Sequence, residues 1–194
     1  INGGGTTSEA YASGNNIGIG NEAFTYYNPT QVANNIAIGK RALYGSSTDL
    51  MAGYQNIAIG TDVLSSVTWG ADNIGIGYQS LLSNTYGDSN VAIGTFSLID
   101  NITGYSNTAN GVTALSSNST GYRNTASGKS SLQSNTTGYS NTANGVSSLL
   151  NNTTGFFNTA IGYNTGLGIT TGSNNTILGA NVTVSSSTLS NNII

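Results

Sequence analysis

Hydrophobic and polar residues follow one another along this chain in a short motif that recurs from end to end. The motif consists of an asparagine, an apolar residue or threonine, a small residue, a variable residue and a glycine. Successive copies lie 19 residues apart, then 21, and then 17 in every later case. The asparagines are Asn16, Asn35, Asn56, Asn73, Asn90, Asn107, Asn124, Asn141, Asn158, Asn175 and Asn192. A fixed period of this kind is the signature of a solenoid, in which each repeat forms one coil.

The residues after each asparagine alternate with the period of two that is typical of a β-strand. The second position is glycine or alanine in every copy before Ile177, between neighbours that are mostly Ile, Val or Thr. Glycine stands four positions after the asparagine, and eight consecutive copies also have glycine three positions before it. We expect these earlier glycines to form a turn with positive φ. A large apolar residue, usually leucine, returns eight positions after the asparagine and predicts a second strand.

These patterns predict an all-β fold, a parallel β-solenoid or β-roll of about eleven coils with a 17-residue repeat. A helix is disfavoured because the 3.6-residue period is missing and Gly, Asn, Ser and Thr each cost roughly 0.5 to 1 kcal/mol relative to alanine. We expect one domain over residues 1–194, with irregular coils that carry insertions in residues 1–52 and regular coils in residues 53–194.

Identical residues stack in such a fold, so Asn16 to Asn175 are expected to form a structural ladder of hydrogen-bonded amides. A second column of the same kind lies eleven positions later, at Asn84, Asn101, Asn118, Asn135 and Asn152.

The apolar content of each coil is small, and the third strand position is polar at Asn110, Ser127 and Asn144. Ordering the backbone costs roughly 1 to 2 kcal/mol per residue, which so thin a core hardly offsets. We therefore expect association of copies, as a trimer, to supplement the core. The column of small residues would allow close approach either inside the coil or between chains, and the sequence leaves both arrangements open.

Charge and residue types restrict the function further. The net charge is −3 and the chain has only four basic residues, so we expect no nucleic-acid partner. No apolar run approaches the length of a membrane-spanning helix, so membrane insertion is not expected either. The chain has no histidine and no cysteine, and we expect no enzyme activity, metal or cofactor. Only a carboxylate mechanism would be compatible, and we interpret its nearest pair, Asp72 and Asp88, as part of a solvated face.

The motifs at residues 35–39 (NIAIG), 56–60 (NIAIG) and 90–94 (NVAIG) resemble the head repeat of trimeric autotransporter adhesins of the YadA type. This resemblance implies a left-handed parallel β-roll in a homotrimer. The repeat of that family is usually shorter than 17 residues, so each coil of this chain should carry a longer turn. The longer repeat, as in residues 121–128 (GYRNTASG) and 131–137 (SLQSNTT), is similar to repeats of bacteriophage tail fibres. The ending at residues 188–194 (TLSNNII) is similar to segments that precede an endosialidase-type intramolecular chaperone domain in such fibres.

The resemblance implies a non-enzymatic fibre segment, a phage tail-fibre shaft or receptor-binding region on a virion. An adhesin head on a bacterial cell surface is the alternative. Both are extracellular, and both would add a host cell-surface glycan or protein as a partner beside the other copies of the chain. A third hypothesis, an ice-binding solenoid, depends on the threonine column at Thr108, Thr125, Thr142, Thr159 and Thr176, which ordinary β-propensity also explains.

Two sets of residues are candidates for receptor contact. Tyr105, Tyr122, Tyr139 and Phe156, together with Tyr54, stand two positions before the ladder asparagine, and the first four should form a continuous aromatic ladder. An exposed ladder could stack on sugar rings, whereas a buried one would only pack. The second set lies in the insertions, at residues 26–29 with Tyr26 and Tyr27 and at residues 46–51, which we expect to loop outward and contact a receptor.

Overall fold

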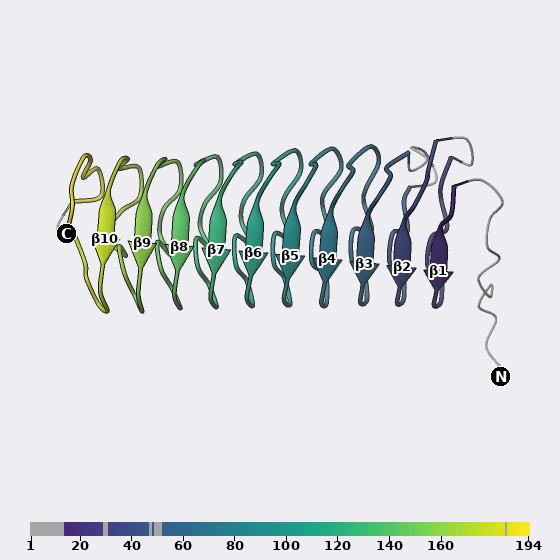
Figure 1. The fold of residues 1–194 in the computed structure, drawn as a ribbon, viewed down its shortest axis with the longest axis horizontal. Helices are drawn as coiled ribbons and strands as arrows, with labels where there is room; N and C mark the ends of the chain where they lie inside the picture. The colour runs from purple at the N-terminus through teal and green to yellow at the C-terminus, as the bar shows by residue number, and fades with distance from the viewer. Residues whose placement is uncertain (1–13, 29–30, 47, 49–51, 185) are drawn as a thin grey trace.

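The computed structural model describes residues 14–28, 31–46, 48, 52–184 and 186–194. They form one sheet of ten parallel three-residue strands, in which each strand pairs with its neighbours in the chain. The strands stand side by side along a rod, with β1 and β10 at opposite ends (Figure 1). Their bounds are β1 (Ile17–Ile19), β2 (Ile36–Ile38), β3 (Ile57–Ile59), β4 (Ile74–Ile76), β5 (Val91–Ile93), β6 (Thr108–Asn110), β7 (Thr125–Ser127), β8 (Thr142–Asn144), β9 (Thr159–Ile161) and β10 (Thr176–Leu178).

Equivalent residues of successive coils are paired in register. Ala58 in β3, for example, pairs with Gly75 in β4 and Ala109 in β6 pairs with Ala126 in β7. The eleventh copy of the motif adds an isolated bridge between Thr176 and Ile193. Ten strands spaced by about 4.8 Å make a row of about 43 Å. The predicted parallel β-solenoid is thus confirmed. No helix in the described ranges is long and apolar enough to cross a membrane.

The prediction of a second strand at the leucine column is wrong. These leucines are buried in the core, but they lie in a turn and adopt the left-handed conformation, with φ of 49° at Leu98 and 50° at Leu132. Such a backbone costs a non-glycine residue about 1 to 2 kcal/mol. Hydrogen bonds between coils continue through the turn, as from the N–H of Leu98 to the carbonyl of Ala114 at 3.0 Å. The leucine pattern therefore identified a core position, and burial did not require an extended backbone.

Positive φ is also absent from the glycines that stand three positions before the ladder asparagine, so that expectation is wrong as well. Space explains this column, because a Cβ on Gly70 would lie 2.6 Å from the carbonyl oxygen of Gly87 in the next coil. The left-handed residue of this turn is the one directly before the asparagine, such as Ser106. Positive φ does occur at the glycines four positions after the asparagine, where it ranges from 122° to 147°.

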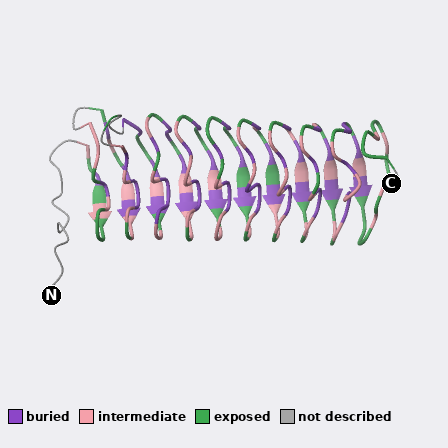
Figure 2. Ribbon diagram, turned by 180° about the vertical axis from the view of Figure 1, so that it is seen from behind, coloured by how far each residue is buried: buried purple, intermediate pink, exposed green. Residues whose placement is uncertain are grey.

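The interior of the rod is narrow and is filled by one small residue from the strand and one leucine from the turn. The middle residue of each strand from β2 to β10 is buried, while the residues on either side of it are partly or fully exposed (Figure 2). Ala92 and Leu98 of one coil, for example, are completely buried. Buried Ser97, Ser131 and Ser148 occupy further inner positions. The small column thus lies inside the coil and not between chains.

Candidate functional site

The asparagine ladder holds neighbouring coils together through every polar atom of its side chains. The side-chain oxygen of Asn107 accepts the backbone N–H of Asn124 at 3.0 Å and its side-chain amide at 3.2 Å. The amide of Asn124 also donates to the carbonyl of Gly138 in the next coil at 2.8 Å. The same pattern of bonds recurs along the described part of the ladder from Asn16 to Asn192, apart from a few missing amide contacts. The side chains from Asn16 to Asn175 are buried, so this part of the column is structural and offers no surface for a ligand.

The second asparagine column is shorter and ends inside the rod. From Asn101 to Asn152 each amide donates to the side-chain oxygen in the preceding coil and to a nearby glycine carbonyl, as Asn118 does to Asn101 and Gly121. Ile169 takes the next position of the column after Asn152. The side-chain oxygen of Asn152 is consequently buried without a hydrogen-bond partner.

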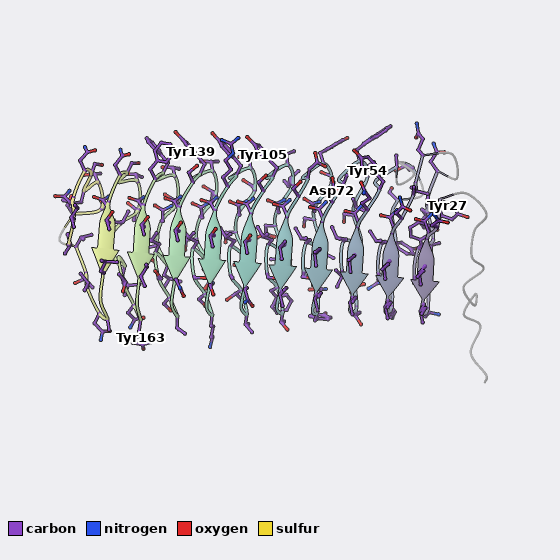
Figure 3. All side chains as sticks on the ribbon, in the orientation of Figure 1. Tyr27, Tyr54, Asp72, Tyr105, Tyr139 and Tyr163 are labelled. Atoms are coloured by element: carbon purple, nitrogen blue, oxygen red, sulfur yellow. The ribbon has the colours of Figure 1, made fainter. Side chains whose placement is uncertain are left out.

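The aromatic ladder is present, and its rings are stacked face to face. Ring centroids of Tyr105 and Tyr122, of Tyr122 and Tyr139, and of Tyr139 and Phe156 are each 4.9 Å apart, with interplanar angles of 3° to 5°. This spacing is that of neighbouring coils. Tyr54, Tyr105 and Tyr139 lie along the same edge of the rod (Figure 3). Tyr54 is separated from the ladder because Ala71 and Asp88 occupy the two coils between them.

Stacking determines what this ladder can bind. The faces of Tyr122 and Tyr139 are covered by neighbouring rings, so a sugar ring has no room to stack on either of them. Their edges and hydroxyl groups remain at the partly exposed surface. Phe157 meets Tyr139 and Phe156 edge-on, and the guanidinium carbon of Arg123 lies 5.9 Å from the ring centre of Tyr122. The two inner rings, Tyr122 and Tyr139, can therefore contact a receptor only through ring edges and hydroxyl groups.

The tyrosines of the first insertion are half-buried. Tyr27 packs against the core and stacks on Phe24, with ring centroids 5.0 Å apart. Tyr26 meets Tyr44 edge-on at 5.1 Å, and a hydrogen bond with Tyr26 is the main cause that raises the pKa of Tyr44, followed by burial. Tyr27 thus packs mainly against the core. Most of the second insertion, residues 47 and 49–51, and also Pro29, lies outside the described residues.

Charged groups do not gather into a reactive centre in the described part of the chain. Asp88 accepts a hydrogen bond from the backbone N–H of Ala71 at 2.8 Å, and Asp72 is exposed in the neighbouring coil. Arg41 and Asp62 form a bidentate ion pair with distances of 2.7 and 2.9 Å, which raises the pKa of Arg41. No group of three or more potential metal ligands occurs among the described residues.

The outer surface of the sheet is a feature that sequence reasoning missed. Because the small middle residue points inward, both flanking residues of each strand point outward. In the first five strands all of these flanking residues are apolar, and we call this surface the isoleucine face. It consists of Ile17, Ile19, Ile36, Ile38, Ile57, Ile59, Ile74, Ile76, Val91 and Ile93, each partly or fully exposed. The sequence pattern that could have indicated this face is a small residue between two isoleucines. Each strand has room for one inward side chain, so the small residue points inward and both isoleucines point outward.

The next three strands continue the same surface with polar residues. Their outward positions are Thr108, Asn110, Thr125, Ser127, Thr142 and Asn144. The sheet therefore has one apolar half and one polar segment along the rod. Comparison with protein-family models, curated proteins and solved structures finds no match to this chain.

Proposed function

We propose that this chain is a structural and adhesive segment of a homotrimeric extracellular fibre, a bacteriophage tail-fibre shaft or receptor-binding region. The observation that carries the proposal is the isoleucine face. Ten apolar side chains on five neighbouring strands make a contiguous surface, and each of them is partly or fully exposed. Surfaces of this kind on soluble proteins mark sites of association, because covering them removes apolar area from water.

The regularity of the rod supports association between identical copies. A second copy presents the same surface with the same coil spacing, so equivalent isoleucines meet over the whole length of the face. Closed symmetric assemblies are the usual form of homo-oligomers, and three copies around one axis bring three such faces together. The narrow interior, with one alanine and one leucine in many coils, explains why this added burial stabilises the chain.

The 17-residue repeat favours a tail fibre over a bacterial adhesin head, because the resemblance to fibres extends over the long turn as well as the strand. The regular surface also fits a shaft that displays the same features at each step. We infer that adhesion takes place on the outer edges of the rod, while the isoleucine face is covered by the other copies.

Ice binding remains the second candidate, and it would require the same sheet surface. Thr108, Thr125 and Thr142 point outward in one row, beside Asn110, Ser127 and Asn144. A trimer would cover this surface and a monomer would leave it open to water. The two functions therefore exclude each other, and the state of association separates them.

Site-specific cross-linking tests the proposal, because the chain has no cysteine of its own. We would compare Ile59→Cys on the isoleucine face with Ser66→Cys, an exposed position away from the strands. A trivalent maleimide should convert the first variant into a covalent trimer and leave the second as single chains. Equal cross-linking of both variants, or none with Ile59→Cys, would contradict a trimer built on this face.

A further inference from the structure

Trp69 and Tyr86 stand at a position where the regular repeat has threonine. Both residues lie four positions before a ladder asparagine, in adjacent coils. The six later coils carry Thr103, Thr120, Thr137, Thr154, Thr171 and Thr188 at that position. The two aromatic side chains are 54% and 56% exposed, so the core does not require them. Replacing threonine by a large exposed aromatic residue in two neighbouring coils creates a local surface unlike the rest of the rod.

The rings of this pair are not stacked on other rings, in contrast to the aromatic ladder. Within the described part of the chain, neither Trp69 nor Tyr86 makes a stacked or edge-on contact with another ring. Tyr54, in the preceding coil, is also exposed and lies on the same edge as Asp72 (Figure 3). Aromatic surface that no other ring covers is therefore exposed to solvent at this edge.

A fixed hydrogen-bond acceptor lies in the same two coils. Asp88, two residues after Tyr86, accepts the backbone N–H of Ala71, two residues after Trp69, through one carboxylate oxygen at 2.8 Å. This bond holds the side chain against the coil of Trp69. The other oxygen, Oδ2, has no hydrogen-bond partner among the described residues, and Asp88 is exposed. A positioned acceptor thus adjoins the exposed rings.

We propose that Trp69, Tyr86 and Asp88 form a binding site for a neutral carbohydrate, an assignment that rests on the adhesive function proposed above. The apolar face of a pyranose ring packs on the indole of Trp69 and contacts the ring of Tyr86, and a sugar hydroxyl donates to Oδ2 of Asp88. Aromatic rings supply contact area while their polar ends stay in water. The carboxylate orients the bound sugar, because a hydrogen bond to a charged acceptor is stronger than one between neutral groups.

The size and charge of the surface favour this ligand class over others. Two adjacent coils span only about 10 Å along the rod, whereas a stable protein interface buries about 800 Å² on each partner. Asp72 and Asp88 lie at this edge and repel phosphate groups and acidic sugars. A single neutral sugar unit, repeated along a polysaccharide, fits a site of this extent.

Trp69 is the one tryptophan of the chain, so its fluorescence reports on the site directly. We would titrate the full chain with maltohexaose, cellohexaose and hexa-N-acetylchitohexaose, which are neutral oligosaccharides. At least one should produce a saturable change in fluorescence. Asp88→Asn and Tyr86→Thr should each weaken that binding by about tenfold or more, since each removes one contact. Tyr86→Thr restores the residue that the repeat uses, so it should fold normally.

Tyr163→Thr is the matched control, because Tyr163 is 53% exposed on the opposite edge of the rod (Figure 3). This variant should bind as the unmodified chain does. The absence of a saturable change with all three sugars, or unchanged binding by both Asp88→Asn and Tyr86→Thr, would overturn the proposed site. A trimer without sugar binding would refute this site alone and keep the fibre, whereas a monomer that binds sugar would refute the trimer and keep the site.

Discussion

The side-chain oxygen of Asn90 accepts two hydrogen bonds from Asn107, one from its backbone N–H at 3.0 Å and one from its side-chain amide at 3.1 Å. The same amide also donates to the carbonyl of Gly121, one coil further on, at 2.8 Å. Asn107 therefore joins three successive coils. A rod with so few apolar residues in each coil depends on buried polar bonds of this kind, because unpaired polar groups in its interior would destabilise it.

Removing one member of the ladder should destabilise the rod strongly. Asn124→Ala removes the acceptor of the backbone N–H of Asn141 and one of the two acceptors of the Asn141 side-chain amide, while the carbonyl of Gly138 keeps its bond from Asn135. An orphaned buried group costs about 1 to 3 kcal/mol, so the free energy of unfolding should fall by about 3 kcal/mol. Urea unfolding followed by circular dichroism would measure the change. The exposed neighbour variant Thr125→Ala is the control and should shift stability by no more than about 0.5 kcal/mol.

The end of the second asparagine column allows a test in both directions. Ile169→Asn would give the orphaned oxygen of Asn152 a donor, and this gain should offset much of the loss of a buried isoleucine. Asn118→Ile inside the column would break three hydrogen bonds and leave the side-chain amide of Asn135 with the carbonyl of Gly138 as its remaining acceptor. We expect the first variant to lie within about 1 kcal/mol of the parent chain and the second to lose about 3 kcal/mol. Equal losses would show that the column adds no hydrogen-bond stability.

Gly128 should not tolerate a side chain. Its φ is 132°, and a Cβ would lie 2.6 Å from the carbonyl carbon and oxygen of Gly145. Gly128→Ala therefore combines backbone strain with a clash against rigid backbone, and thermal unfolding should occur at a clearly lower temperature. Ser127→Ala, at the preceding outward position, is the comparison. A Gly128→Ala chain as stable as Ser127→Ala would mean that the coils can separate at this turn.

The first coils should lose stability in strong alkali through Tyr44. Its hydrogen bond with Tyr26 holds the pKa of Tyr44 above the ordinary value in the folded chain. A raised folded pKa stabilises the protonated form, so this contribution is complete below about pH 10 and disappears as the pH rises through the folded pKa. The urea midpoint of the parent chain should fall more steeply above pH 10 than that of Tyr44→Phe. Parallel pH profiles would contradict this role.

The period, the fold class, the asparagine ladders and the aromatic ladder could be predicted because each follows from stacking identical residues. The conformations of the turns could not be predicted from the sequence. Leucine rarely adopts positive φ, so nothing in its column indicated that Leu64 or Leu98 would occupy a left-handed turn. The outward direction of Ile57 and Ile59 was readable only after Ala58 was assigned to the interior, which required the width of the coil.

The candidate receptor contacts could likewise be predicted only in part. Tyr122 and Tyr139 are at the predicted position, but their stacking removes the ring faces that sugar binding would use. Trp69 lies in the same part of the repeat, and it became a candidate only when its exposure and lack of ring neighbours were known. Repetition therefore indicates where side chains align, while the accessible faces depend on packing.

The solution mass of the chain, measured by light scattering, tests the trimeric fibre segment most directly. The account predicts three times the single-chain mass of 19.7 kDa for the unmodified chain. It also predicts the mass of a single chain for the double variant Ile38→Lys, Ile59→Lys, which places two charges on the isoleucine face. A mass of 19.7 kDa for the unmodified chain at micromolar concentration would contradict the account.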